Sequence, residues 1–170
     1  GGLDAGPNYN VIYSSADFSI EQADLIVGAD AGQSKTYGET DPVFSSSITG
    51  LASGDAVIGA LSRVEGEDVG SYEILIGGLD AGPNYNVIYT SADFSIDQRP
   101  LTVGVSAADK VYDGTATAVV SFSDDRVSGD VFQTQYVSAL FSDANAEGNK
   151  DVEVLGISIS GGTAANYSLV

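Results

Sequence analysis

The sequence predicts an all-β protein built from small repeated modules that follow one another end to end. In short runs, apolar residues alternate with polar ones, which is the pattern of strands with one buried face. A segment of 20 residues occurs twice, at 1–20 and 77–96, with Ser14 against Thr90 as the one difference. We therefore expect β-sandwich-like modules that form a rod, with an immunoglobulin-like or a β-grasp-like sheet as alternatives.

The strands expected in the first part of the chain show this alternation clearly. Leu25, Val27 and Ala29 would share one face of a strand, and the same spacing recurs later in the chain. Glycine, aspartate, asparagine and serine bound each run, as expected for turns. The expected strands cover residues 25–29, 72–76, 85–89 and 94–96.

The second part of the chain predicts strands at residues 101–105 and 152–159. The alternation changes phase within 152–159, and Gly156 lies at the change, so a bulge or a sharp bend is expected there. No segment has the apolar stripe of a long helix, although a short helix near Gly54 or Gly129 would fit.

The repeat also predicts where the modules begin and end. Residues 35–38 (KTYG) align with 110–113 (KVYD), and the pairs Gly-Asp and Asn-Tyr recur in each copy. We predict that residues 1–20 are the terminal strand of a preceding module and that 21–97 is a complete module. Residues 98–170 then form a module that lacks its final strand.

The linkers between modules are predicted to be short. Residues 20–25 and 96–101 leave almost no chain between the last strand of one module and the first strand of the next. Pro100 fixes its own φ and restricts Arg99. Modules of about 75 residues have marginal cores, so packing between neighbours would help to stabilise them. A semi-rigid rod is expected.

Composition excludes several functions. The 170 residues include 24 acidic and 6 basic side chains, for a formal net charge of -18. A charge of this sign disfavours nucleic acid and anionic membranes as partners, and no apolar run is long enough to insert into a membrane. With no Cys and no His, thiol or histidine catalysis and Cys/His zinc sites are excluded.

Two stretches resemble modules of bacterial surface proteins. Residues 35–55, followed by GEDVGSYEI and PNYNVIY, resemble the MBG module; residues 109–122, followed by SGDVF and ANYSL, resemble the YDG module. Such modules occur in large exported adhesins of the filamentous-haemagglutinin type. The resemblance implies an extracellular location at the bacterial cell surface and a structural role in a stalk or filament that supports attachment or biofilm. It supplies no catalytic, cofactor-binding or metal-binding residue.

The acidic clusters near the linkers are the candidate calcium ligands. Calcium needs several oxygen ligands in a compact array, and a bound ion would stiffen a linker. A solvated acidic surface is the favoured interpretation, so we predict no cofactor and keep calcium at the module junctions as the alternative. The clusters consist of Asp17, Glu21 and Asp24 at one linker and Asp93 and Asp97 at the other.

The two lysines of the aligned motifs, Lys35 and Lys110, are candidates for an intramolecular isopeptide bond. The favoured interpretation is a stem packed on Tyr37 or Tyr112 with the ammonium group in water. An intact mass lower by one ammonia per bond would reveal the covalent alternative.

Glycan binding and catalysis are the remaining alternatives. Tyrosines could stack on sugars, but the alternation predicts that they are core or half-buried residues: Tyr37, Tyr72, Tyr85, Tyr112 and Tyr167. A carboxylate pair from Glu65, Glu67 and Asp68 would be needed for glycosidase chemistry. These three lie in a glycine-rich turn, so we predict no enzymatic activity.

The two ends of the chain leave two interpretations open. An unpaired apolar strand at residues 8–20 tends to seek a sheet edge, and the module at 98–170 lacks a strand of this type. One chain's strand would then complete another's module and build a head-to-tail filament. The favoured alternative is a segment of a longer repeat protein. The expected partners are thus neighbouring modules of the same protein or other copies of it, with surface glycans or a host glycoprotein as the alternative.

Overall fold

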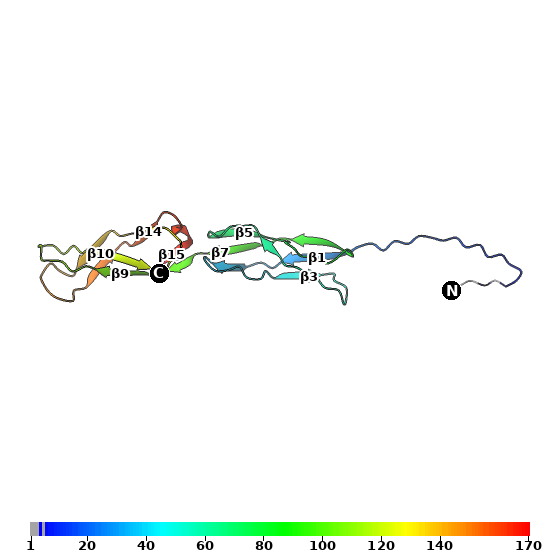
Figure 1. Ribbon diagram of the computed structural model, residues 1–170, viewed down its shortest axis with the longest axis horizontal. Helices are drawn as coiled ribbons and strands as arrows, with labels where there is room; N and C mark the ends of the chain where they lie inside the picture. Colours follow the sequence, from blue (N-terminus) through cyan, green and yellow to red (C-terminus); the bar gives the residue numbers. More distant parts are fainter. Residues whose placement is uncertain (1–3, 5) are drawn as a thin grey trace.

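The computed structural model describes residue 4 and residues 6–170. In this part of the chain the regular structure is β-strand apart from one short 3-10 helix, which confirms the all-β fold class. Figure 1 shows the strands in two groups that follow one another along an elongated molecule. We call residues 23–97 the first module and residues 98–170 the second module.

The first and last parts of the first module run side by side in parallel. β1 pairs with β6, with Ala23 opposite Tyr85, and β2 pairs with β7, with Gln33 opposite Phe94. β3 pairs antiparallel with β1, and the other sheet has the order β2-β7-β5-β4. The strands are β1 (Ala23–Ala29), β2 (Gln33–Thr36), β3 (Ser46–Thr49), β4 (Ser62–Arg63), β5 (Gly70–Leu75), β6 (Tyr85–Thr90) and β7 (Asp93–Asp97).

The second module repeats part of this topology. β8 pairs in parallel with β15 as β1 does with β6, and β12 pairs antiparallel with β13 as β4 does with β5. Residues 108–112 align with β2 but form no strand. The elements are β8 (Arg99–Leu101), β9 (Val103–Ala107), β10 (Val120–Asp124), β11 (Gln133–Gln135), β12 (Ser138–Phe141), β13 (Val152–Leu155), β14 (Ser158–Ser160), η1 (Ala164–Asn166) and β15 (Tyr167–Leu169).

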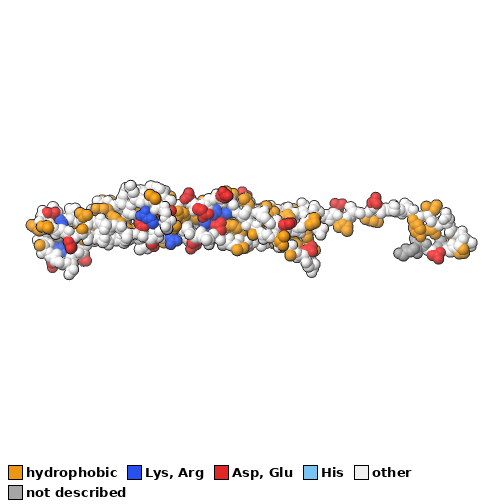
Figure 2. Space-filling model, viewed as in Figure 1, with side chains coloured by type: hydrophobic (Ala, Val, Ile, Leu, Met, Phe, Trp, Pro, Cys, Tyr) orange, Lys and Arg blue, Asp and Glu red, His pale blue; other side chains and the backbone are white. Residues whose placement is uncertain are grey.

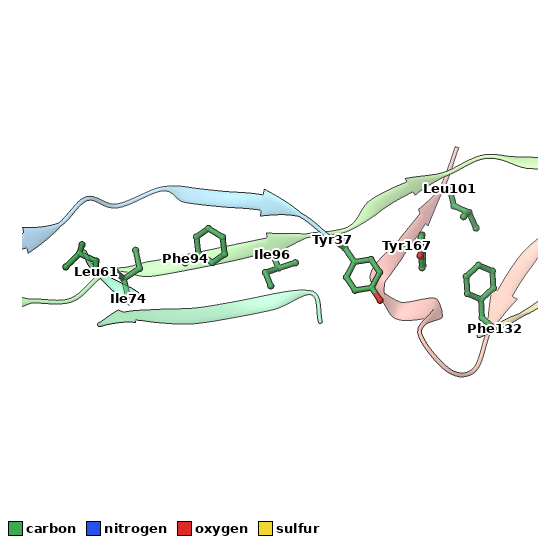
Figure 3. Close-up of a cluster of buried hydrophobic side chains, with 8 residues drawn as sticks. All are labelled: Tyr37, Leu61, Ile74, Phe94, Ile96, Leu101, Phe132 and Tyr167. Atoms are coloured by element: carbon green, nitrogen blue, oxygen red, sulfur yellow. The ribbon is translucent and has the colours of Figure 1, made fainter. Parts of the chain in front are cut away.

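One apolar core runs from the first module into the second. Buried side chains of β5 and β7 continue through the junction to buried side chains of β8 and β15, as Figure 3 shows. A smaller cluster at the other end of the first module consists of Leu25, Val27 and Tyr85. The continuous cluster consists of Tyr37, Leu61, Ile74, Phe94, Ile96, Leu101, Phe132 and Tyr167.

The bend expected in the second module is present. β13 ends at Leu155 and β14 begins at Ser158, and Gly156 between them has φ +69°. A Cβ on Gly156 would lie 2.5 Å from Val137 Cγ2, so both the backbone conformation and the close approach require glycine. The expected short helix near Gly54 or Gly129 was wrong, because both residues lie in turns.

The segment before β1 pairs with no strand among the described residues. Residue 4 and residues 6–22 include no β-strand, and Figure 1 shows an extended chain that leads away from β1. The side chains of Phe18 and Ile20 are 94% and 101% exposed. Residues 1–3 and 5 of the predicted terminal strand lie outside the described residues. No helix in the described part of the chain is long and apolar enough to cross a membrane.

Candidate functional site: the junction between the modules

The two modules meet where β7 leads into β8 through Gln98 alone. The side-chain amide of Gln98 donates hydrogen bonds to the backbone oxygens of Ala165 (3.0 Å) and Tyr167 (3.2 Å). These two hydrogen bonds hold the linker against η1 and β15 of the second module, and the short connection predicted from the sequence is present.

Tyr37 extends from the end of β2 into the second module. Its backbone N–H donates to the oxygen of Asp97 (2.9 Å), which holds the residue beside the end of β7. The next residue, Gly38, has φ +83°, and a Cβ there would lie 2.6 Å from Val127 Cγ2. Only glycine allows this turn to lie so close to the second module.

An aromatic contact and a shared carboxylate join the modules here. The rings of Tyr37 and Tyr167 meet edge to face with centroids 5.4 Å apart, which is a favourable aromatic geometry. The Tyr37 hydroxyl donates to Asp130 Oδ1 (3.0 Å), and the Tyr167 hydroxyl donates to Asp130 Oδ2. The Tyr167 hydroxyl also accepts the N–H of Val127 at 2.8 Å. Both rings are buried.

The environment of the two hydroxyls favours their neutral form. Burial, with the hydrogen bond to Asp130 as the second cause, raises the pKa of Tyr167 to about 12. Burial and the same carboxylate also raise the pKa of Tyr37. A phenolate beside Asp130 would place two negative charges in contact, so the network requires protonated tyrosines.

Asn166 makes a second set of hydrogen bonds across the junction. It is 3% exposed, and its side chain reaches the turn that precedes β5. Its Oδ1 accepts the N–H of Val69 (2.9 Å), and its Nδ2 donates to Asp68 Oδ1 (2.8 Å). A buried amide is tolerated when its donors and acceptors are paired, and here both partners belong to the other module.

Family models divide the chain at this junction. Residues 25–95 match the MBG domain (YGX type), and residues 97–170 match the YDG domain. We call these two matched parts of the chain the MBG domain and the YDG domain. The resemblance inferred from the two tyrosine motifs is thereby confirmed, and the match indicates β-rich modules of a repeat type. No match was found among curated proteins or among solved structures.

At its end away from the YDG domain, the MBG domain has the same hydrogen bonds that the YDG domain contributes to the junction. The hydroxyl of Tyr85 donates to Asp55 Oδ2 (2.6 Å) and accepts the N–H of Ala52 (2.9 Å). The side-chain amide of Gln22 donates to the backbone oxygens of Pro83 (2.9 Å) and Tyr85 (3.3 Å). These residues correspond to Tyr167, Asp130, Val127 and Gln98 in the YDG domain.

Lys35 lies in an ion-pair cluster inside the MBG domain. Its Nζ lies 2.7 Å from Asp41 and 2.5 Å from Glu67, and its side chain is 3% exposed. Arg63 pairs with the same two carboxylates at 2.7 and 2.6 Å. The prediction of an ammonium group in water was wrong for Lys35, because two acidic side chains compensate its burial.

The cluster alters the acidity of its members. Burial by itself lowers the pKa of Lys35, but the hydrogen bonds to Asp41 and Glu67 outweigh it and raise the pKa. The hydrogen bond from Arg63 lowers the pKa of Asp41, and the hydrogen bond from Lys35 lowers that of Glu67. Both carboxyl groups are therefore held in the ionised form, and each of them forms an ion pair with Lys35.

The other lysine of the aligned motifs, Lys110, lies at the surface. It contacts Asp113 (2.9 Å) and the hydroxyl of Thr115 (2.9 Å). Hydrogen bonds from Lys110 and Thr115 lower the pKa of Asp113 to about 2. These contacts fix the turn that carries the YDG motif.

The tyrosine prediction holds in the cores and fails at one position. Tyr37, Tyr85 and Tyr167 are buried, and Tyr72 is half-buried. Tyr112 is 65% exposed, contrary to the prediction. In the MBG domain the corresponding Tyr37 is covered by the YDG domain, whereas no described segment covers Tyr112.

The carboxylates proposed as calcium ligands lie apart or have other partners. No group of three or more potential ligands gathers within residue 4 and residues 6–170. Asp24 accepts a hydrogen bond from Asn86 (2.8 Å), and Glu21 accepts one from Ser19 (2.8 Å). In the glycine-rich turn, Glu67 pairs with Lys35, and Asp68 binds Asn166 rather than forming a carboxylate pair.

Sequence reasoning noticed the residues of this junction but not their role. The recurrence of Gly-Asp and Asn-Tyr was used only to align the modules. The informative signal was that a Gly-Asp pair and an Asn-Tyr pair accompany each tyrosine motif. Such a recurrence is expected when successive modules contact one another in the same way. Asp68 had no such signal, because its partner lies 98 residues later in the chain.

Proposed function

We propose that this chain is a stalk or filament segment of a bacterial extracellular adhesin that supports surface attachment or biofilm. The observation that carries the proposal is the apolar core that continues from the MBG domain into the YDG domain. A flexible linker would fix neither the relative orientation of the two domains nor the end-to-end length of the chain. A buried junction fixes the angle between neighbouring domains.

The surface charge fits an exposed spacer. With a formal net charge of -18, copies of the chain repel one another except where specific contacts form. Figure 2 shows the acidic side chains spread along the molecule rather than gathered in one patch. This distribution suits a solvated extracellular rod. We propose no enzymatic activity and no cofactor.

A surface-display experiment tests the spacer function. Residues 21–170 are placed in one or two copies between a membrane anchor and a binding domain on a bacterial cell, opposite a ligand coated beneath a polymer layer. Attachment is expected to increase with the number of copies, because a stiff spacer extends in proportion to its length. A glycine-serine linker of equal residue number is the control. Equal attachment with that linker would contradict the proposal.

Binding of surface glycans or a host glycoprotein is the second candidate. The observation that favours it is the exposed ring of Tyr112 beside an open groove of about 460 Å³. Aromatic faces of this kind stack on sugars. A glycan array with the whole chain tests the candidate, with Tyr112→Ala as the matched variant. Binding that is lost in this variant would support it, and an array without signal would contradict it.

A further inference from the structure

Two turns of the MBG domain make the hydrogen bonds that cross the junction. We call residues 37–41, which follow β2, the first turn, and residues 65–69, which precede β5, the second turn. In the first turn, the hydroxyl of Tyr37 donates to a carboxylate of the YDG domain (3.0 Å), and Figure 3 shows its ring directed toward that domain. In the second turn, Asp68 and Val69 bind a buried asparagine of the YDG domain (2.8 and 2.9 Å). The fit between the domains therefore depends on where these two turns lie.

Each of the two turns carries one carboxylate of the ion-pair cluster. Asp41 ends the first turn, and Glu67 directly precedes Asp68 in the second turn. The Nζ of Lys35 lies 2.7 Å from Asp41 and 2.5 Å from Glu67, so one ammonium group joins the two turns. Arg63 joins the same two carboxylates at 2.7 and 2.6 Å. The cluster therefore links the turns to each other, close in the chain to the residues that contact the YDG domain.

The two cations of the cluster belong to the sheet and not to the turns. Lys35 lies in β2 and Arg63 in β4, and their side chains are 3% and 6% exposed. The guanidinium carbon of Arg63 lies 5.1 Å from the ring centroid of Tyr72 and 5.5 Å from that of Phe94, which is the geometry of a cation–π contact. Because these rings belong to β5 and β7, the sheet fixes the positions at which the carboxylates of the turns meet the cations.

Further hydrogen bonds hold the second turn against the same side chains. Arg63 Nη1 donates to the backbone oxygens of Val64 (3.0 Å) and Gly66 (2.5 Å). The hydroxyl of Tyr72 donates to the backbone oxygen of Asp68 (2.7 Å). The second turn is thus held by Arg63 and Tyr72 on its MBG side while its Asp68 side chain binds the YDG domain.

The aligned lysine of the YDG domain, Lys110, has hydrogen bonds within a single turn. Its Nζ binds Asp113 and Thr115, which lie three and five residues later in the chain, and its side chain is 27% exposed. A link between two turns is therefore a property of the cluster in the MBG domain and not of the aligned lysine as such. Lys110 offers a matched control for Lys35.

We propose that the ion-pair cluster controls the stiffness of the junction, because it holds the first and second turns in the positions from which they contact the YDG domain. Loss of a partner in the cluster releases a turn and lets the two domains move relative to one another, while the sheets of the MBG domain stay formed. The inference deepens the proposed stalk function and rests on it, since it identifies the residues that set the stiffness of the stalk.

The cluster requires ionised carboxylates, so the junction should loosen in acid. The charged groups that face the two carboxylates are Lys35 from β2 and Arg63 from β4, and β5 and β7 contribute the aromatic rings beside Arg63. Hydrogen bonds from these cations lower the pKa values of Asp41 and Glu67 in the folded chain. Their contribution is therefore present above the carboxyl pKa of an unfolded chain, about 4, and is lost as the pH falls below it.

Pulsed electron spin resonance on the whole chain tests the proposal at neutral pH with two pairs of labels. Thr49→Cys with Val119→Cys reports the distance between the domains, and Thr49→Cys with Ser71→Cys reports a distance within the MBG domain. All three native side chains are exposed, and the natural chain has no cysteine. Labelled chain is diluted with an excess of unlabelled chain, so that each label has one partner. Both distance distributions are expected to be narrow in the parent chain.

Glu67→Ala is the decisive variant. It removes the carboxylate that joins the second turn to Lys35 and Arg63, and it leaves no buried cavity because the Glu67 side chain is 69% exposed. The distribution between the domains is expected to broaden, while the distribution within the MBG domain stays narrow. Glu65→Ala replaces an exposed glutamate of the same turn that is not part of the cluster, and it should leave both distributions narrow.

Lys35→Met tests the link from the side of the cation. Methionine keeps an unbranched stem but has no ammonium group to join the two turns, so the distribution between the domains is expected to broaden. Lys110→Met makes the same change at the aligned position of the YDG domain, and the distribution between the domains should stay narrow. Equal broadening in the two variants would contradict the role given to the cluster.

Acid titration of the parent chain orders two events. The distribution between the domains is expected to broaden at a higher pH than the distribution within the MBG domain, because the turns are released before the sheets unfold. Broadening of both label pairs at the same pH would contradict the inference.

The outcomes at neutral pH separate this inference from the stalk function. A narrow distribution between the domains in Glu67→Ala would overturn the inference. Broadening of both label pairs in that variant would overturn it as well, because the cluster would then hold the whole MBG domain and not the two turns. Either result leaves the stalk function standing if the parent chain has a narrow distribution between the domains, whereas a broad distribution in the parent chain would overturn the stalk function itself.

Discussion

Asn166 shows how a single side chain can hold two domains together. Its amide bonds to Val69 and Asp68 exist only while the MBG and YDG domains are in contact. Its counterpart Asn84 is exposed, although a tyrosine follows it in the sequence as well. The two asparagines therefore form a matched pair, one at a junction and one at a free surface.

Replacing this asparagine should destabilise the chain. Asn166→Ala leaves the N–H of Val69 and a carboxylate oxygen of Asp68 without their partner, at a cost of about 1–3 kcal/mol in the free energy of unfolding. Asn84→Ala should cost less than about 0.5 kcal/mol. Urea unfolding followed by circular dichroism measures both. Equal effects of the two substitutions would show that Asn166 contributes nothing through the junction.

The tyrosine network predicts a loss of stability at alkaline pH. The pKa of Tyr167 is about 12 in the folded chain and about 10 in an unfolded one. The neutral hydroxyl therefore stabilises the fold below pH 10, and this contribution is lost as the pH rises from about 10 to 12. Tyr167→Phe has no such proton to lose, so its melting temperature should fall less over this interval.

Melting curves at several pH values between about 8 and 12 measure this effect. Tyr9→Phe is the control, since Tyr9 is 75% exposed and lies before the first strand. It should retain the full alkaline loss seen in the wild type. A Tyr167→Phe variant with the same slope as the wild type would remove Tyr167 as the cause.

At the scale of elements, the turn after β2 is the part of the junction that is most sensitive to shape. Gly38 has a positive φ, and a Cβ added to it would lie 2.6 Å from Val127 Cγ2. Gly54 also has a positive φ (+96°), but no atom lies within 4 Å of the position of its Cβ. Comparison of the two separates backbone strain from contact between the domains.

Gly38→Ala should therefore cost more than Gly54→Ala. Both substitutions place alanine in the left-handed region, at about 1–2 kcal/mol. Only Gly38→Ala also pushes Val127 away and opens the junction, so its cost should exceed that of Gly54→Ala by about 1 kcal/mol or more. Thermal unfolding measures the difference. A smaller cost for Gly38→Ala would contradict the packing seen at this turn.

The elements were predictable where the alternation was regular. Leu25 and Val27 in β1, and Phe94 and Ile96 in β7, are buried as their spacing predicts. The pairing was not predictable, because parallel contacts such as that of β1 with β6 join residues about 60 positions apart. Local pattern carries no information on such partners. Tyr112 was misjudged for a related reason, since a neighbouring domain rather than the strand itself covers its counterpart.

At the scale of the whole molecule, we expect the junction to make the two small domains behave as one body. Each domain alone has a core close to the minimum for stability. The continuous cluster that includes Ile96, Leu101 and Tyr167 removes this limit by extending the core across the boundary. The short linker, and from it a semi-rigid rod, could be predicted from the sequence. The contacts of Asp130 and Asn166 across the junction could be found only in the structure.

The measurement that tests this account most directly is the distance between the two domains by pulsed electron spin resonance. Spin labels are attached at Val43→Cys in the MBG domain and Val119→Cys in the YDG domain, where both native side chains are exposed. The labelled chain is diluted with an excess of unlabelled chain, so that each label has one partner. A single narrow distance distribution is predicted, which broadens in Gly38→Ala and stays narrow in Gly54→Ala. A broad distribution in the parent chain would contradict the account, because the two domains would then move independently.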